Sequence, residues 1–130
     1  MTLEVHVVTP EREVWVGRAD MVIARGTEGE VGILSGHAPM LVRLAIGPLR
    51  VLGEGPELRS VIDGGFLHVT SVDETTRVDV LATSASLESE IDLVRERRRA
   101  EEMERRIGET DDAEAHTELA KALARVHLMA

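Results

Sequence analysis

Cysteine and tyrosine are absent from this 130-residue chain, which contains a single tryptophan and a single phenylalanine. Without cysteine, the chain has no disulfide framework, no thiolate zinc site and no cysteine nucleophile. With so few aromatic side chains, a surface that stacks nucleic-acid bases or sugar rings is not expected. The same scarcity means that the hydrophobic core has to be built from aliphatic side chains.

Positive charge is also in short supply, since 15 lysines and arginines face 24 acidic residues and give a net charge of −9. Nucleic acids and anionic membranes attract clustered positive charge, so neither is expected to be a direct partner. The sequence has no signal-like apolar stretch and no apolar run long enough to span a bilayer. We expect a soluble protein that stays where it is made, without direct membrane insertion, and that reaches a membrane only through its partners.

The composition changes near Ala85, and this change predicts two domains, 1–84 and 85–130. The first part holds every proline and all the glycines except Gly108, and it is rich in β-branched residues. The second part is rich in Glu, Arg, Ala and Leu. Turn-forming residues punctuate short strands, whereas the second composition is typical of helices.

Alternating apolar and polar residues recur at short intervals in the first domain and predict about nine strands. Gly47-Pro48 and Gly64-Gly65 are interpreted as turns between them. The pattern predicts an antiparallel β-sandwich or flattened barrel, with Trp15 as a core or rim residue. The expected strands are Leu3–Val7, Val14–Val16, Ala19–Ala24, Ile33-Leu34, Met40–Leu44, Leu49–Leu52, Leu58–Ile62, Phe66–Val69 and Arg77–Leu81.

The second domain is predicted to be an antiparallel two-helix hairpin, which makes the chain an α+β protein. Ser86 is the expected N-cap of a first helix over residues 87–107, and Gly108 its left-handed stop. Asp111 and Glu114 resemble a capping box for a second helix after a loop of about four residues. The apolar stripe of the first helix is interrupted at residues 95–99, so we expect a hairpin that depends on packing against another surface.

No pattern in the chain predicts catalysis. The sequence lacks a phosphate-binding P-loop, a nucleophile elbow and any His or Asp/Glu spacing typical of a metal site. His6 and His68 occupy alternating strand positions and are expected to face solvent. The arginines at 95–99 form either a solvated helix face or a docking patch for acidic protein surface or phosphate.

A glycine-rich segment, Gly26 to Met40, is the most unusual stretch of the chain and reads GTEGEVGILSGHAPM. Glycine at this density indicates positive φ angles or close backbone approach. The residues alone leave two interpretations open. The segment is either an ordered loop that presents Glu28, Glu30 and His37 to a partner, or a set of tight turns between strands.

This segment resembles the signature of the epsilon subunit of the F-type ATP synthase, whose usual form is close to Gly-Glu-x-Gly-Ile-Leu-Pro-Gly-His-x-Pro. Ser35 departs from it by replacing a proline. The resemblance continues in family order through Gly47–Val51, Asp63–Val69, Val78–Ala82 and the charged helical tail, and so covers essentially the whole chain.

The resemblance implies a non-catalytic rotor subunit, present in one copy per complex, in which the sandwich binds the gamma subunit and the c-ring. The helical hairpin would extend toward the catalytic alpha/beta head and inhibit ATP hydrolysis. By matched position, Glu30 would face the c-ring and His37 the gamma subunit. Gly29, Gly32 and Gly36 would shape that loop. The chain begins directly at its first strand, which favours a peripheral protein on the cytoplasmic face of a bacterial plasma membrane.

Some bacterial members of this family bind ATP through a first-helix motif Ile/Leu-Asp-x-x-Arg-Ala. Ile91, Asp92 and Arg95 match that motif, whereas Glu96 replaces the alanine. Lys121 and Arg125 stand where basic partners of the second helix are expected. Because Glu96 brings a negative charge beside a polyanion, we expect weak ATP binding or none, and no other cofactor.

Two alternatives come from other classes of protein. One is a free-standing β-sandwich binding module with a helical oligomerisation tail, which a pull-down of rotor proteins would distinguish. The other is a small metal-dependent hydrolase, which would contain bound metal.

Overall fold

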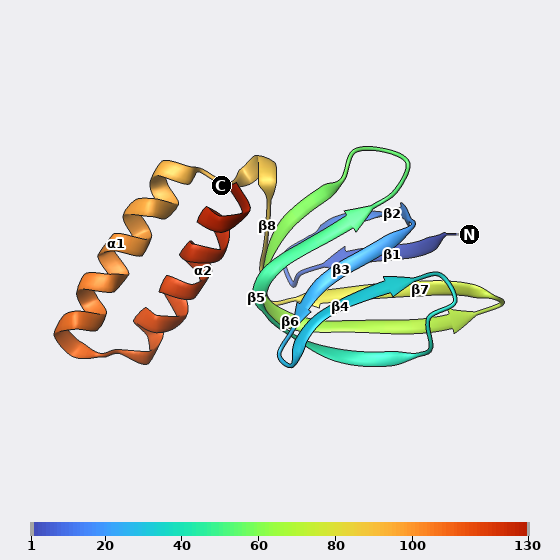
Figure 1. Cartoon of the computed structure of the whole chain (residues 1–130), viewed down its shortest axis with the longest axis horizontal. Helices are drawn as coiled ribbons and strands as arrows, with labels where there is room; N and C mark the ends of the chain where they lie inside the picture. Colours follow the sequence, from blue (N-terminus) through green and yellow to red (C-terminus); the bar gives the residue numbers. More distant parts are fainter. Residues whose placement is uncertain (1, 130) are drawn as a thin grey trace.

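The computed structural model describes residues 2–129, and over this range the chain forms a β-sandwich followed by two helices (Figure 1). A short 3-10 turn, η1 (Glu88–Glu90), links the two parts. The strands are β1 (Leu3–Val8), β2 (Glu13–Ala19), β3 (Met21–Gly26), β4 (Gly29–Leu34), β5 (Met40–Leu52), β6 (Leu58–Val72), β7 (Thr75–Ala82) and β8 (Ala85–Leu87).

The strands form one continuous sheet in the order β2-β1-β7-β6-β5-β3-β4, with β8 added on β6. The pairing between β5 and β6 skips Ala45 and Gly64, so the first half of β5 and the second half of β6 belong to one layer, and their other halves to the second layer. The sheet is therefore folded over into a flattened sandwich that is not closed. Its neighbouring strands are antiparallel except β1 and β7, which pair in parallel.

The turns predicted at Gly47-Pro48 and Gly64-Gly65 are wrong, because β5 and β6 run through both positions. The glycines bend a strand here and do not end it. Gly64 and Gly65 have φ angles of 91° and 134°, in the region that favours glycine. A Cβ on Gly65 would lie 2.1 Å from the carbonyl oxygen of Leu81, so this position also requires the missing side chain.

Aliphatic side chains fill the space between the two layers, as the scarcity of aromatic residues predicted. Leu3, Leu49, Leu67 and Val78 are completely buried in this core. Trp15 is partly buried at its rim, which confirms its predicted position, and its ring lies against Gly17. The sandwich thus has a continuous apolar core that contains no residue from the helices.

The two helices are α1 (Leu93–Thr110) and α2 (Ala113–Met129), and their ends differ from the prediction. Ser86 does not cap α1, since residues 85–87 extend the sheet; the N-cap is Asp92, whose carboxylate accepts from the Arg95 N–H at 3.2 Å. Gly108 lies inside α1, and Asp111 (φ 46°) takes the left-handed C-cap position. The aspartate that accepts from the first turn of α2 is Asp112, not Asp111.

The buried stripe of α1 also differs from the predicted one. It runs through Leu93, Glu96, Ala100, Met103 and Ile107, whereas Val94 is 58% exposed. The apolar stripe is interrupted at residues 95–99, as predicted, but the inner face continues through the interruption with Glu96. A glutamate on the inner face of a helix is unusual and requires a partner.

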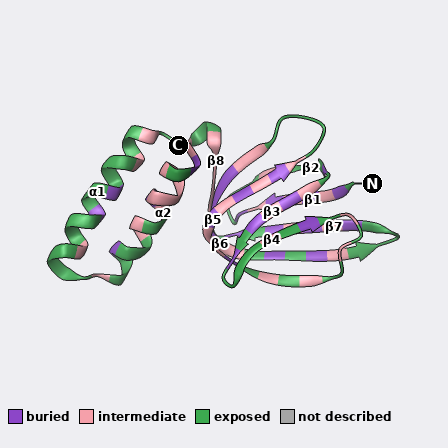
Figure 2. Ribbon diagram, in the orientation of Figure 1, coloured by how far each residue is buried: buried purple, intermediate pink, exposed green. Residues whose placement is uncertain are grey.

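The hairpin lies beside the sandwich, with α2 against β5 and β6 and α1 farther out (Figure 1). Figure 2 shows that the outer surface of α1 is exposed while buried positions line its contact with α2. Val61 on β6 is fully buried but lies outside the main core. Because strand side chains alternate and Ile62 enters the core, Val61 points to the face that α2 covers.

Candidate partner-binding surfaces

The glycine-rich segment is a strand with a turn at each end and not a single loop. Gly29 and Glu30 begin β4, directly after the turn at Thr27 and Glu28, and Gly32 lies within the strand. His37 belongs to the connection 35–39 after β4 ends. Glu30 and Leu34 are four positions apart along the strand, which corresponds to about 13 Å. The expectation that Glu30 and His37 share one loop is therefore corrected, and they lie at opposite ends of β4.

The connection 35–39 is ordered by hydrogen bonds. Gly36 has a φ of 87°, and its N–H donates to the Thr76 hydroxyl at 2.7 Å. The His37 N–H donates to the Leu34 carbonyl at 3.1 Å, and its Nδ1 lies 2.7 Å from the Ala38 carbonyl. Glu30 is exposed, as expected, whereas His37 is half-buried. Figure 1 shows this connection at the end of the sandwich far from the helices.

The outer face of the β2-β1-β7-β6-β5 layer carries large apolar side chains that sequence reasoning missed. Phe66 is paired with Leu81, and Leu81 with Val8, so the three form one row across three strands. Leu41 and Val16 lie at the two ends of the next row, with His68, Asp79 and His6 between them. Exposed fractions are 65% for Leu41, 52% for Leu81 and 46% for Phe66. We call Val16, Leu41, Phe66 and Leu81 the exposed apolar face.

A signal for this face was present in the sequence. Phe66 alternates with Leu67, His68 and Val69, so a core that takes Leu67 and Val69 leaves Phe66 and His68 outside. The structure has His68 exposed and His6 mostly buried beside Glu4, at 3.1 Å, so the prediction that both face solvent holds only for His68. Within residues 2–129 no three His, Asp or Glu side chains are grouped as a metal site would require.

The residues expected to contact ATP do not form one site. Asp92, Arg95 and Arg125 line one cleft, together with Glu96, Glu102 and Glu118, but Ile91 lines a different one. The Lys121 Nζ lies 3.4 Å from Glu118. Arg125 is already engaged, since its Nη2 donates to the Asp63 carboxylate at 2.8 Å and its Nη1 lies 3.5 Å from Glu96.

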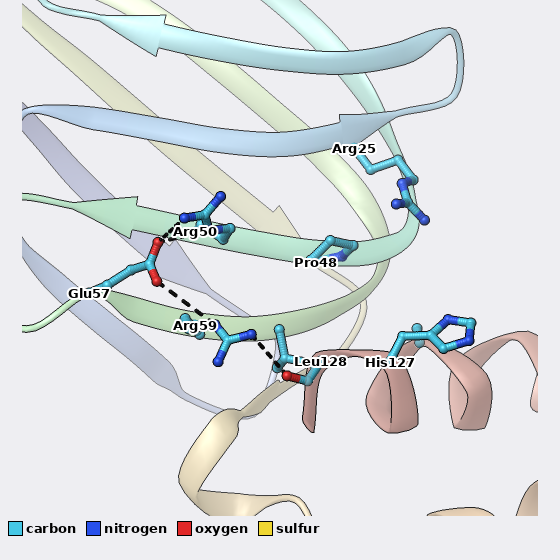
Figure 3. A pocket seen from close by; sticks show the side chains of 8 residues that line it. Arg25, Pro48, Arg50, Glu57, Arg59, His127 and Leu128 are labelled. Atoms are coloured by element: carbon cyan, nitrogen blue, oxygen red, sulfur yellow. Dashed lines mark hydrogen bonds and ion pairs between the residues drawn. The ribbon is translucent and has the colours of Figure 1, made fainter. Parts of the chain in front are cut away.

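A second cleft of about 380 Å³ lies where α2 meets the sheet (Figure 3). Arg50 and Arg59 face it from the sheet and share Glu57, while His127 comes from α2. The Nη2 of Arg59 donates to the Leu128 carbonyl at 2.9 Å, one of the last carbonyls of α2. Arg59 thus ties the C-terminal turn of α2 to β6.

The fold and these surfaces define a class of protein: a β-sandwich without a catalytic cluster among its described residues, carrying a docked helical hairpin. The family model for the ATP synthase delta/epsilon chain β-sandwich domain matches residues 2–88. The chain belongs to this family.

The chain is 46% identical over 127 residues to the ATP synthase epsilon chain of Thermobifida fusca, covering 95% of this chain and 89% of that one. It is 41% identical to the epsilon chain of Brevibacillus brevis, covering 82% and 79%. It is also 34% identical to that of Shouchella clausii, covering 96% and 92%. The two full-length matches include the helical hairpin as well as the sandwich.

These relatives identify the chain as a non-catalytic subunit of the ATP synthase, of the epsilon type. Solved structures of ATP synthases contain chains of similar fold. A chain of the Euglena gracilis mitochondrial ATP synthase, determined as an OSCP/F1/c-ring assembly, matches with a TM-score of 0.78 and 27% identity, covering 98% of this chain and 79% of that one. A chain from the Tetrahymena thermophila central stalk and c-ring shares the fold, with a TM-score of 0.53 at 22% identity and 69% coverage of both. No helix within residues 2–129 has the length and apolar character of a membrane span.

Proposed function

We propose that this chain is a rotor subunit that links the gamma subunit to the c-ring and so helps to couple proton flow to ATP synthesis. The observation that carries the proposal is the exposed apolar face at one side of a rigid sandwich. A torque-bearing part needs broad, tightly packed contacts and no catalytic groups. Exposed apolar side chains in adjacent rows are typical of a surface that a protein partner covers.

The exposed apolar face is the proposed contact for the gamma subunit, and His37 lies in the connection that we propose extends it. Phe66→Asp should weaken the binding of purified gamma subunit at least 100-fold, because a charge would be buried in the centre of the contact. Val94→Asp is the matched control, since Val94 is equally apolar and 58% exposed but lies on α1. Equal loss of binding in both variants would contradict this assignment.

The turn before β4 is the proposed contact for the c-ring, with Glu30 as the exposed polar residue and Gly29 and Gly32 shaping the segment, while Gly36 shapes the connection at the other end of β4. Glu30 and His37 lie at opposite ends of β4, which suits two different partners better than one. Glu30→Ala should leave gamma binding unchanged but reduce proton-driven ATP synthesis in the reassembled complex. A Glu30 variant that loses gamma binding would argue against this separation.

The hairpin is the proposed regulator of ATP hydrolysis, acting on the alpha/beta head when it extends from the sandwich. Its docked position in the structure gives the proposal a starting state. The test is to add the full chain, or the chain truncated after Glu90, to catalytic head and gamma subunit depleted of it. The full chain should slow hydrolysis and the truncated chain should not; equal rates would contradict regulation by the hairpin.

Nucleotide is a weak ligand at most in this proposal. Arg125 already has two carboxylate partners, and Ile91 lies away from the cleft of Asp92 and Arg95, so ATP would have to displace internal contacts. Titration calorimetry on the isolated chain should find millimolar affinity or none at the predicted residues Ile91, Asp92, Arg95, Lys121 and Arg125. Micromolar affinity would contradict it.

We also propose that one copy is present per complex, located peripherally on the cytoplasmic face of a bacterial plasma membrane. The proposed domain boundary lies between residues 84 and 85, so that β8 is the part of the second domain that pairs with the sandwich. Affinity purification of the tagged chain from membranes should recover the gamma, alpha and beta subunits and the c-ring. Recovery of the chain alone would favour the alternative of a free-standing binding module.

A further inference from the structure

One arginine joins both helices to the sandwich. Arg125 extends from α2, donates through Nη2 to Asp63 on β6 at 2.8 Å, and brings Nη1 to 3.5 Å from Glu96 on α1. Three elements therefore meet at a single guanidinium. We call Asp63, Arg125 and Glu96 the ion bridge.

The ion bridge is more deeply buried than the surface ion pairs of the chain. Its side chains are 1% exposed for Asp63, 13% for Glu96 and 19% for Arg125, compared with 45% and 39% for the pair Arg12–Glu90. Surface pairs contribute little because water and salt screen them. Breaking a partly buried pair is costly because the remaining charge loses its partner away from water.

Asp63 is held in place by the sandwich and not by the hairpin. The Ser84 hydroxyl donates to Asp63 Oδ2, and the Asp63 N–H donates to the Ser84 carbonyl at 3.0 Å. The bend at Gly64 and Gly65 follows directly. The carboxylate therefore keeps its position when the hairpin leaves, and it can receive Arg125 again when the hairpin returns.

The ion bridge is incompletely satisfied. Asp63 Oδ1 and Arg125 Nε are both buried and lack a hydrogen-bond partner among residues 2–129. A partly satisfied buried network stabilises less than a complete one. The other contacts of the hairpin with the sandwich are modest, chiefly Val61, Leu128 and the hydrogen bond from Arg59. The docked state is therefore held by few interactions, and the ion bridge is the one that joins both helices to the sandwich.

We propose that the ion bridge is the latch that decides whether the hairpin stays on the sandwich. Glu96 and Asp63 supply the anionic partners of Arg125 from within the chain, so docking needs no bound ligand. The latch rests on the hairpin movement of the proposed function, but it concerns an equilibrium of the isolated chain. It can therefore be measured without any other subunit.

The absence of cysteine from the sequence makes a direct test possible. Val61→Cys introduces one thiol at a position that α2 covers, and the rate of its labelling by a thiol reagent reports how often the hairpin opens. In this background, Asp63→Asn should raise the labelling rate at least ten-fold. Glu96→Gln should raise it about three-fold, because Glu96 lies farther from Arg125 and is more exposed.

Glu118→Gln is the matched control. Glu118 pairs with Arg99 and Lys121 within the hairpin, so its loss removes ion pairs between helical residues without touching the sandwich. It should change labelling less than two-fold. The fluorescence of Trp15, which packs at the core rim, checks in each variant that the sandwich is folded; if Asp63→Asn unfolds it, Glu96→Gln carries the test.

Equal labelling rates in Asp63→Asn and Glu118→Gln would overturn the latch. So would additive effects of Asp63→Asn and Arg125→Gln in the double variant, because partners in one bridge have to be coupled. A chain with the predicted labelling that fails to inhibit hydrolysis contradicts only the proposed function. A chain that inhibits hydrolysis with labelling unchanged by Asp63→Asn contradicts only the latch.

Discussion

The sandwich and the hairpin of this chain are stabilised in different ways. The sandwich buries Leu, Ile and Val side chains from six strands, and Ala19 from β2, in one continuous core. The hairpin buries three alanines, one methionine and Leu128, and its inner face includes the charged Glu96 and Arg125. Alanine removes little apolar surface from water, so the hairpin gains less free energy for each residue that it orders.

The consequence is a rigid part and a releasable part in one chain. An element with few buried apolar contacts opens at low free-energy cost, whereas core strands open only when the whole domain unfolds. This division suits the proposed function, in which the sandwich transmits force and the hairpin regulates hydrolysis. Four predictions test whether the two parts are stabilised separately.

Leu67→Ala should destabilise the sandwich by about 2–5 kcal/mol, because it removes a completely buried leucine from the centre of β6 and leaves a cavity. Denaturant unfolding followed by Trp15 fluorescence measures this change. Leu81→Ala, on the exposed face of the neighbouring strand, is the control and should stay within about 1 kcal/mol. A similar loss of stability in both variants would mean that the buried core does not account for most of the stability of the sandwich.

Met103→Ala should destabilise the hairpin by about 1–2 kcal/mol and leave the sandwich unchanged. Met103 is the largest completely buried side chain of α1, but its neighbours are small and the site can relax. Circular dichroism at 222 nm should show earlier loss of helix, while the Trp15 signal keeps its midpoint. Coincident shifts of both signals would contradict two separately stabilised parts.

Truncation after Glu90 should leave a folded sandwich whose stability falls by about 1 kcal/mol or less, since the main core contains no helical residue. The cut is placed after Glu90 because β8 pairs with β6 and Glu90 closes the linker. Truncation after Ser84 is the informative comparison and should cost more, because it exposes that edge of β6. An unfolded 1–90 chain would show that the sandwich needs the hairpin.

Glu90→Gln should have the smallest effect, and one that depends on pH. The hydrogen bond from Arg12, at 2.7 Å, and that from the Leu87 N–H lower the pKa of Glu90 in the folded chain. Because the pKa of Glu90 is lower in the folded chain than in the unfolded chain, its ionised carboxylate stabilises the folded chain at pH values above the unfolded-state pKa. This stabilisation is lost as the pH falls through the folded-state pKa. The melting temperatures of wild type and variant should therefore differ slightly at pH 7 and converge in acid. A difference that grows in acid would contradict this.

Local sequence patterns were sufficient to predict the two-part division, the aliphatic sandwich and the helical hairpin. Strand alternation and helix periodicity depend only on which residues must be buried, so they survive without knowledge of partners. The same reasoning failed at glycines, because glycine allows both a turn between strands and a bend within one strand. Gly64 and Gly65 are typical of turns, but the pairing of β6 with both β5 and β7 continues the strand through them as a bend.

Which charged residues are buried depends on contacts between different elements of the tertiary structure. In the sequence, Glu96 belongs to a charged run that is typical of a solvated helix face. In the structure it lies beside Arg125, 29 residues later. Ser86 was predicted to be a helix N-cap, but in the structure it lies in β8, which pairs with β6. The separation of Glu30 from His37 likewise depends on β4 pairing with β3. For Glu96 and Ser86 a partner distant in sequence outweighs the local preference, because burial and pairing free energies exceed propensities of a few tenths of a kcal/mol.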